Sequence, residues 1–296
     1  MVRERGRRTL ARDQLAAAHG RLQEVSPAVG RLDERAFHDL LRTDADAAVA
    51  LIADLSAATD PALRAQARRL AARVFVRAGR RGAGAAAGYR RLQPGATGEG
   101  DLDLERTLER AGGRPRRAED LVVRSWRAPR RALCLLVDHS GSMEGHAVGL
   151  AAMAAAAVVL TRSERTSCSV IAFAADALVL QHQGERRPAA ALVDDLMSLR
   201  GRGRTDLALA LRTAARELAS PHAAERLAIV LSDCRATAGA DPLAATRGLD
   251  RVDVLGTSAD ADAVAAGRAL ARRARGRYLA ATRYAELQDA LAAALR

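Results

Sequence analysis

Residues 132–138 read A-L-C-L-L-V-D, an unbroken apolar run that ends in an aspartate. A run of this kind is typical of a β-strand that is buried on both faces of a sheet. A similar run, L-A-I-V-L-S, occupies 227–232 and is followed by Asp233, and V-D-V-L-G-T over 252–257 predicts another strand. The chain from 132 onward therefore predicts a sheet that is covered on both sides.

Helical patterns alternate with these strands. Apolar residues recur at helical spacing over 145–162, 188–199, 206–219, 260–275 and 282–295. Shorter strands are predicted at 167–173, 177–181 and 277–280. Because strands that alternate with helices build a mostly parallel sheet with helices on both faces, we predict an α/β fold with a doubly wound, Rossmann-like sheet.

The first hundred residues have a different pattern. Helices are predicted over 9–25, 30–42, 46–57 and 60–78. Asp60 is the expected N-cap of the last helix, because Pro61 follows it. Residues 79–100 are rich in glycine and predict a mobile linker. We therefore divide the chain into an Arg-rich helical region with its linker (1–100), a connecting segment (101–131) and the α/β domain (132–296).

The composition excludes several kinds of chemistry. Every one of the 47 basic residues is arginine, and asparagine is also absent, which is typical of a GC-rich bacterial genome. Without lysine the chain cannot carry a standard phosphate-binding P-loop, and it cannot form Schiff bases on lysine. The net charge is +12, and +10 of it lies in residues 1–131. A basic segment can bind nucleic acid or an acidic partner, but aromatics make up only 2%, which disfavours base stacking.

The cysteines and the apolar stretches indicate where the protein works. Cys134, Cys168 and Cys234 form no C-x-x-C pair, so zinc and disulfide frameworks are disfavoured and all three are expected to be small buried residues. The N-terminus lacks an apolar signal-peptide region. The longest apolar stretch, 147–160, is too short to span a bilayer. We therefore expect a cytoplasmic protein without membrane contact.

Oxygen-bearing side chains follow the buried strands. Open α/β sheets bind ligands beyond the carboxyl ends of their strands, where the strand order reverses. The candidate segments are D-H-S-G-S (138–142), G-R-G-R-T-D (201–206) and Ser232-Asp233. Their carboxylates and hydroxyls are hard donors of the kind that Mg²⁺ or Mn²⁺ accepts. The predicted metal ligands are Asp138, Ser140, Ser142, Thr205 and Asp233, with one coordination position left for a carboxylate of another protein.

These five residues match the metal-ion-dependent adhesion site (MIDAS) of von Willebrand factor A (VWA) domains. The flanks L-L-V-D-x-S-G-S-M and T-D-L-A-x-A-L resemble the bacterial branch that includes CoxE-like proteins and the D subunit of magnesium chelatase. The resemblance covers roughly 118–296. It implies direct metal contacts from Ser140, Ser142 and Thr205, and water-mediated contacts from Asp138 and Asp233. It also implies a non-catalytic subunit whose partner is a MoxR-type AAA+ ATPase, in the assembly of a client enzyme or the insertion of its metal.

The sequence departs from this family pattern at three positions. Arg202 and Arg204 stand in a loop that is often all glycine, where they would weaken metal binding or grip an acidic partner. Cys234 follows Asp233 where glycine is common, so the local turn lacks the glycine that usually forms it. His139 lies at a variable position and is expected to be a surface residue.

Other functions compete with the interaction subunit. A magnesium or cobalt chelatase-type subunit is one alternative, although this chain has no ATPase-like domain of its own. A Mg²⁺-dependent phosphohydrolase is another, but its D-x-D motif would need a carboxylate where Ser140 stands. A serine hydrolase would need a G-x-S-x-G elbow, and the sequence around Ser140 does not have one. A nucleic-acid-binding adaptor would use the basic residues 1–131. A purely structural alternative is that Asp138 and the serines only cap the following helix. We expect the chain not to be an enzyme.

Overall fold

The computed structural model describes residues 9–84, 91–95, 101–127, 130–141, 143, 146–162, 166–199, 203–219 and 223–295. At its centre is a sheet in the order β6-β5-β4-β7-β8-β9, in which β6 runs antiparallel to β5 and the other pairings are parallel. The strands are β4 (Arg131–Asp138), β5 (Thr166–Phe173), β6 (Ala177–Gln181), β7 (Glu225–Ser232), β8 (Arg251–Gly256) and β9 (Tyr278–Ala280). The predicted α/β fold with a mostly parallel sheet is confirmed.

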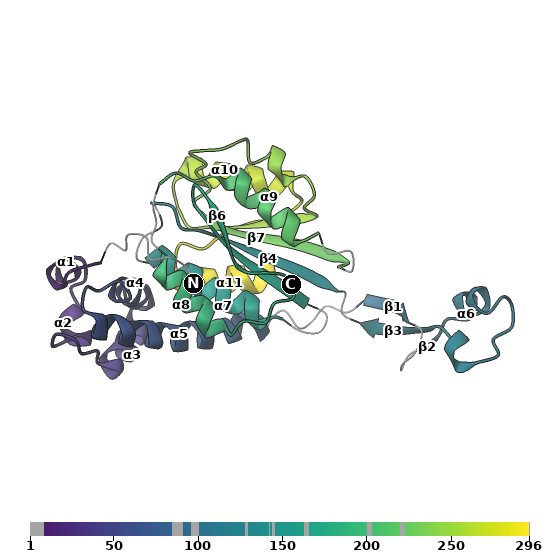
Figure 1. Ribbon diagram of the computed structural model, residues 1–296, viewed down its shortest axis with the longest axis horizontal. Coiled ribbons are helices and arrows are strands. Elements are labelled where there is room, and N and C mark those ends of the chain that lie inside the picture. Colours follow the sequence, from purple (N-terminus) through teal and green to yellow (C-terminus); the bar gives the residue numbers. More distant parts are fainter. Residues whose placement is uncertain are drawn as a thin grey trace.

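Helices cover both faces of the sheet (Figure 1). One face carries α7 (His146–Leu160), α8 (Ala189–Ser198) and α11 (Tyr284–Ala294), and the other carries α9 (Leu207–Glu217) and α10 (Ala261–Arg273). Along β4, Leu133 and Leu135 pack into the first core, whereas Cys134 and Leu136 pack into the second. Successive strand residues point to opposite faces, so a strand between two helical layers is apolar at every position.

The strand order reverses beside β4. The chain passes from β4 through α7 to β5 on one side, whereas β7 pairs with β4 on the other side and leads away to β8 and β9. Because β4 and β7 are parallel, their carboxyl ends lie at the same edge of the sheet. Asp138 ends β4 and Asp233 directly follows β7. Both aspartates therefore stand at the position where such sheets bind ligands.

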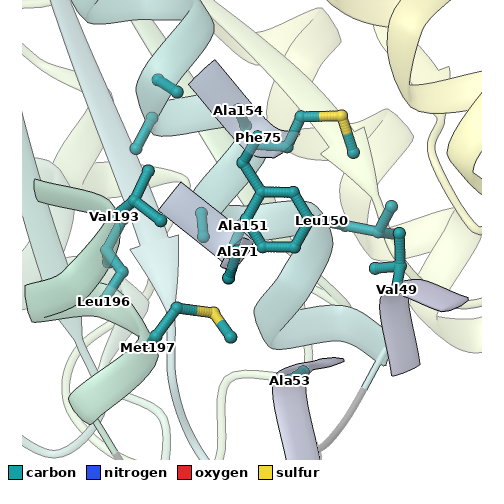
Figure 2. Close-up of a cluster of buried hydrophobic side chains, with 14 of the residues drawn as sticks. Val49, Ala53, Ala71, Phe75, Leu150, Ala151, Ala154, Val193, Leu196 and Met197 are labelled. Carbon is teal, nitrogen blue, oxygen red and sulfur yellow. The ribbon is translucent and has the colours of Figure 1, made fainter. Parts of the chain in front are cut away.

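Five further helices precede the sheet: α1 (Arg12–Ala18), α2 (Leu22–Val25), α3 (Glu34–Thr43), α4 (Ala45–Leu55) and α5 (Pro61–Gly84). Of these, α4 and α5 pack against α7 and α8, and their buried residues belong to the same hydrophobic core as the sheet. Figure 2 shows the ring of Phe75 from α5 surrounded by apolar side chains of the neighbouring helices, and this ring is fully buried. The N-terminal helices thus form a further layer outside α7 and α8. None of the described helices is long and apolar enough to cross a membrane.

The structure corrects the linker prediction. Residues 79–84 continue α5, and 91–95 form strand β1 (Arg91–Gly95). Gly79 is buried against α7, where an added Cβ would lie 2.8 Å from the backbone nitrogen of Ala157. This glycine therefore permits close helix packing rather than flexibility. The predicted helix over 9–25 is also divided into α1 and α2, and residues 85–90 and 96–100 lie outside the described ranges. The N-cap role of Asp60 is confirmed, because its Oδ1 accepts from the nitrogens of Ala62 and Leu63.

A small arm precedes β4. It comprises β1, β2 (Asp101–Leu102), β3 (Val123–Arg127) and α6 (Leu104–Arg110), with the strands in the order β1-β3-β2. Within it, the buried carboxylate of Asp103 pairs with Arg124 at 2.8 Å. Because β3 leads into the first residue of β4, the arm projects from the sheet end opposite to Asp138 (Figure 1). The domain boundaries at 100 and 131 stay predictions.

The first turn of α11 is held by Glu286, and this contact predicts a pH dependence. Its carboxylate accepts from the hydroxyl of Thr282 (2.6 Å) and from Arg283. These bonds, the hydroxyl first, lower the pKa of Glu286 from 4.5 to about 2. A carboxyl whose pKa is lower in the folded state stabilises the fold above its unfolded pKa, and that stabilisation is lost as the pH falls from about 4.5 toward 2.

We expect E286Q to reduce the free energy of unfolding by about 1 kcal/mol at neutral pH, where the carboxylate is charged. The difference from the unsubstituted chain should shrink as the pH falls below about 4.5. Urea denaturation followed by circular dichroism at several pH values measures it. A difference that does not change with pH would contradict this account of Glu286.

Candidate metal centre

Asp138 is the most buried carboxylate at the sheet edge, with 1% of its surface exposed. Its Oδ1 accepts from the backbone nitrogen of Ser140 (2.8 Å), and its Oδ2 accepts from the hydroxyl of Ser232 (2.5 Å). Burial raises the pKa of Asp138, hydrogen bonds from Ser232 and Ser140 oppose this, and the negative charge of Asp233 raises it further. Two carboxylates from separate strands are therefore held close enough to repel each other.

The turn after β7 places Asp233 beside this group. The hydroxyl of Ser232 accepts from the nitrogen of Cys234 (2.8 Å), and Oδ1 of the half-buried Asp233 accepts from the nitrogen of Arg235 (3.0 Å). Cys234 has φ = +58°, in the left-handed region that glycine adopts most easily. The turn is thus the one that glycine favours, and Cys234 adopts it with its thiol buried.

Thr205 is held in place by two neighbouring loops. Its nitrogen donates to the hydroxyl of Thr237 (2.9 Å), and its carbonyl accepts from the nitrogen of Thr237 (3.0 Å). The next residue, Asp206, donates its N–H to the carbonyl of Ala174 just after β5 and caps α9 through the nitrogen of Leu209. Thr205 is 4% exposed. These contacts fix it between the loops that follow β5 and β7.

The structure brings most of the predicted ligands to one edge. Asp138, Ser140 and Asp233 lie together at the ends of β4 and β7, and Thr205 lies in the adjoining loop. The first and second segments also meet, because an added Cβ on Gly141 would lie 4.0 Å from the carbonyl oxygen of Gly203. Ser142 lies outside the described residues. The metal-binding role of all five residues stays a prediction.

The donors present suit a hard cation. Within the described ranges, no three or more His, Cys, Asp and Glu side chains group closely enough to hold a metal by themselves. A cation here would therefore depend on the hydroxyls of Ser140 and Thr205, the two carboxylates and water, which is an all-oxygen set that fits Mg²⁺ or Mn²⁺. Its charge would also relieve the repulsion between Asp138 and Asp233, so the residues present fit the implied metal.

The departures from the family pattern have defined places. The Nε of Arg204 donates to the carbonyl of Thr237 (2.8 Å), so this guanidinium braces the loop that carries Thr205. Arg202 lies outside the described residues. His139 is half-buried rather than fully on the surface, and its backbone N–H donates to the carbonyl of Phe173. Among the described residues, the carboxylate of Asp138 accepts from Ser140 and Ser232 and does not cap α7 (His146–Leu160).

The supporting roles of two residues were not predicted from the sequence, although Ser232 lies in a candidate segment. Ser232 orients Asp138, and its hydroxyl at the end of a buried strand, next to Asp233, was a usable signal. Thr237 holds Thr205 from a loop 32 residues away along the chain. No local pattern marks Thr237, because its role comes entirely from the approach of two loops.

The three thiols are predicted to be inert in the folded protein. Burial raises the pKa of Cys134 to about 12, that of Cys168 to about 11 and that of Cys234 to about 12. Because the thiolate is the reactive form, we expect no labelling by Ellman's reagent at mildly alkaline pH until denaturant is added, and then three equivalents. Rapid labelling of the native protein would show that one of these thiols is accessible.

Comparisons with known proteins place the chain in a family. The family model described as "VWA domain containing CoxE-like protein" matches residues 66–289, from within α5 to within α11. A von Willebrand factor type A structure from Catenulispora acidiphila is 19% identical, with a TM-score of 0.48, and the match covers 59% of this chain and 44% of that one. An aerotolerance-related membrane protein from Bacteroides fragilis is 19% identical, with a TM-score of 0.44, over 56% of this chain and 98% of that one.

A third solved structure, the PilB minor pilin from Streptococcus sanguinis, is 15% identical, with a TM-score of 0.46, over 59% of this chain and 63% of that one. A sequence comparison with curated proteins found no match. The family model alone spans well over half of the chain, and it includes β4, β7 and the loops that carry the candidate ligands. The chain therefore belongs to the family of VWA domain containing CoxE-like proteins.

Proposed function

We propose that this chain is a non-catalytic interaction subunit that binds an acidic side chain of a partner protein through a metal ion. Mg²⁺ or Mn²⁺ would be held directly by Ser140, Ser142 and Thr205, and through water by Asp138 and Asp233. The observation that carries the proposal is that Asp138, Ser140 and Asp233 lie together at the point where the strand order reverses, with Thr205 held in the adjoining loop.

The surroundings of Asp138 favour binding over catalysis. Both of its oxygens already accept hydrogen bonds, and its side chain is buried. A nucleophilic carboxylate needs an exposed oxygen that can reach the substrate, and a second carboxyl is needed to move the proton. At the position of that second group stands Ser140. The same residues suit a metal site, because a held carboxylate can orient water on the cation.

The partner we propose is a MoxR-type AAA+ ATPase acting with a client protein. The chain has no lysine and therefore no standard P-loop of its own, so ATP hydrolysis would be supplied by another subunit. Membership of the VWA domain containing CoxE-like family supports a role in protein interaction. A chelatase-type subunit would work by the same mechanism on a different client. Identifying the client would therefore distinguish a chelatase-type subunit from the proposed interaction subunit.

Metal titration tests the site. We expect isothermal titration calorimetry with Mn²⁺ and Mg²⁺ to show binding by the unsubstituted chain and an affinity about tenfold or more lower in T205A, because a ligand hydroxyl is lost. The matched control is T213A, since Thr213 lies in α9, the helix that follows Thr205, and its hydroxyl bonds only to the carbonyl of Leu209 among the described residues. Equal affinities for T205A and T213A, or no metal binding by the unsubstituted chain, would contradict the proposal.

A second experiment tests the partner. If an AAA+ ATPase gene neighbours the gene for this chain, the two proteins should co-elute in size-exclusion chromatography with Mg²⁺ and separate in EDTA. T205A should separate in both buffers, whereas T213A should behave like the unsubstituted chain. Co-elution that is unaffected by EDTA would show that the metal is not part of the contact.

A further inference from the structure

A second site candidate lies in the N-terminal layer. A pocket of about 620 Å³ opens between α3, α5 and the start of α11. Its apolar residues are Leu41 from α3, Val74 and Ala78 from α5, and Tyr284 from α11. This volume lies within the range that is typical of ligand-binding pockets. Nothing in the metal-site proposal uses this pocket.

Cationic side chains surround the apolar floor. Arg35 and Arg42 contribute from α3 and Arg77 from α5, and His38 lies between the two α3 arginines along the helix. Arg42 pairs with Asp39, the one acidic residue of the lining. In the part of the chain that the structure describes, Arg35 and Arg77 have no ion-pair partner. Two exposed guanidinium groups therefore face the same pocket with their charge unneutralised.

The pocket walls are fixed by contacts between elements. Glu34 of α3 pairs with Arg73 of α5 beside the pocket. The N–H of Tyr284 donates to Asp46 of α4, and its hydroxyl accepts from Gln288. Asp46 also bonds to His146, the first residue of α7. Through Asp46, the Tyr284 side of the pocket is therefore tied to the start of α7.

We propose that this pocket binds an acidic segment of a partner protein. An apolar side chain of that segment would fill the floor formed by Leu41, Val74 and Tyr284, and flanking carboxylates would pair with Arg35 and Arg77. Arginine suits this role, because its planar guanidinium donates two parallel hydrogen bonds to a carboxylate. An extended peptide fits better than a small anion, since the cations are exposed along two separate helices around an apolar floor.

A defined peptide tests the proposal in the absence of metal. The probe is a fluorescein-labelled Asp-Glu-Leu-Leu-Glu-Asp peptide, measured by fluorescence anisotropy in EDTA so that the metal centre does not contribute. We expect binding by the full chain and an affinity at least about tenfold lower for R35Q/R77Q, because the charge pairs are lost. The peptide in which both leucines are serine should also bind about tenfold or more weakly, because the apolar anchor is removed.

The matched control is R212Q/R216Q. Both arginines are exposed on α9, on the opposite face of the sheet. Replacing them removes the same net charge from the chain as R35Q/R77Q does. Their loss should change the affinity less than about twofold, through long-range charge alone. An equal loss in the two double variants would overturn the proposal, because the peptide would then be held by net charge. The proposal would also be overturned if citrate or inorganic phosphate, at the same concentration as the peptide, displaced the peptide from the unsubstituted chain but did not bind R35Q/R77Q. The pocket would then be a small-anion site.

Discussion

Replacing Asp253 by alanine is expected to lower the free energy of unfolding by about 2–3 kcal/mol, because hydrogen bonds to a buried carboxylate are lost, whereas the partly exposed guanidinium groups of its two arginine partners can still reach water. Asp253 lies in the middle of β8 and is fully buried. Its Oδ1 accepts from Nε of Arg251 and from the backbone nitrogen of Arg277, both at 2.9 Å, and its Oδ2 pairs with the guanidinium groups of both arginines. The carboxylate therefore joins β8 to the connection between α10 and β9.

The consequence of its loss follows from that geometry. Alanine would leave Arg251 and the N–H of Arg277 without their acceptor next to a tightly packed backbone, where an added Cβ on Gly276 would lie 1.7 Å from the carbonyl oxygen of Val252. D253N should lose less stability than D253A, because the amide oxygen of asparagine can still accept one of these hydrogen bonds. Chemical denaturation of the three proteins measures the differences. A loss for D253A that is no larger than that for D253N would contradict the proposed role of the ion pairs.

Replacing Gly79 by valine is expected to cost about 3 kcal/mol or more, because overpacking at a backbone contact forces two helices apart. A Cβ on Gly79 would lie 2.8 Å from the nitrogen of Ala157 and 3.1 Å from its Cα. Neither atom can rotate away, in contrast to the tip of a side chain. The separation of α5 from α7 would open the core around Phe75 that Figure 2 shows.

The matched control is G20V, since an added Cβ on Gly20 would meet no atom within 4 Å. Thermal unfolding of G79V, G20V and the unsubstituted chain compares the two positions. We expect G20V to remain within about 0.5 kcal/mol of the unsubstituted chain. If G79V unfolds like G20V, then α5 does not contribute to the same cooperative core as the sheet.

The sequence was sufficient for the sheet and for the ends of its strands. The runs ending at Asp138 and Asp233 are apolar at every position because β4 and β7 have helices on both sides, and this leaves a local signature in the chain. The D-x-S-x-S pattern that begins at Asp138, and Thr205 just before a predicted helix, then indicated the candidate ligands. These patterns are readable because each depends on neighbouring residues in one element.

Only the tertiary structure decided how Asp138 and Thr205 are held and where the N-terminal helices pack. The bond from Ser232 to Asp138 and the contact between Thr205 and Thr237 join residues far apart in the chain, so no spacing announces them. Gly79 shows the same limit: glycine allows both a flexible linker and a close helix contact, and only the presence of α7 against it selects the second. Local sequence thus determined the elements and the chemistry at their ends, whereas their mutual support depended on contacts that exist only after the chain has folded.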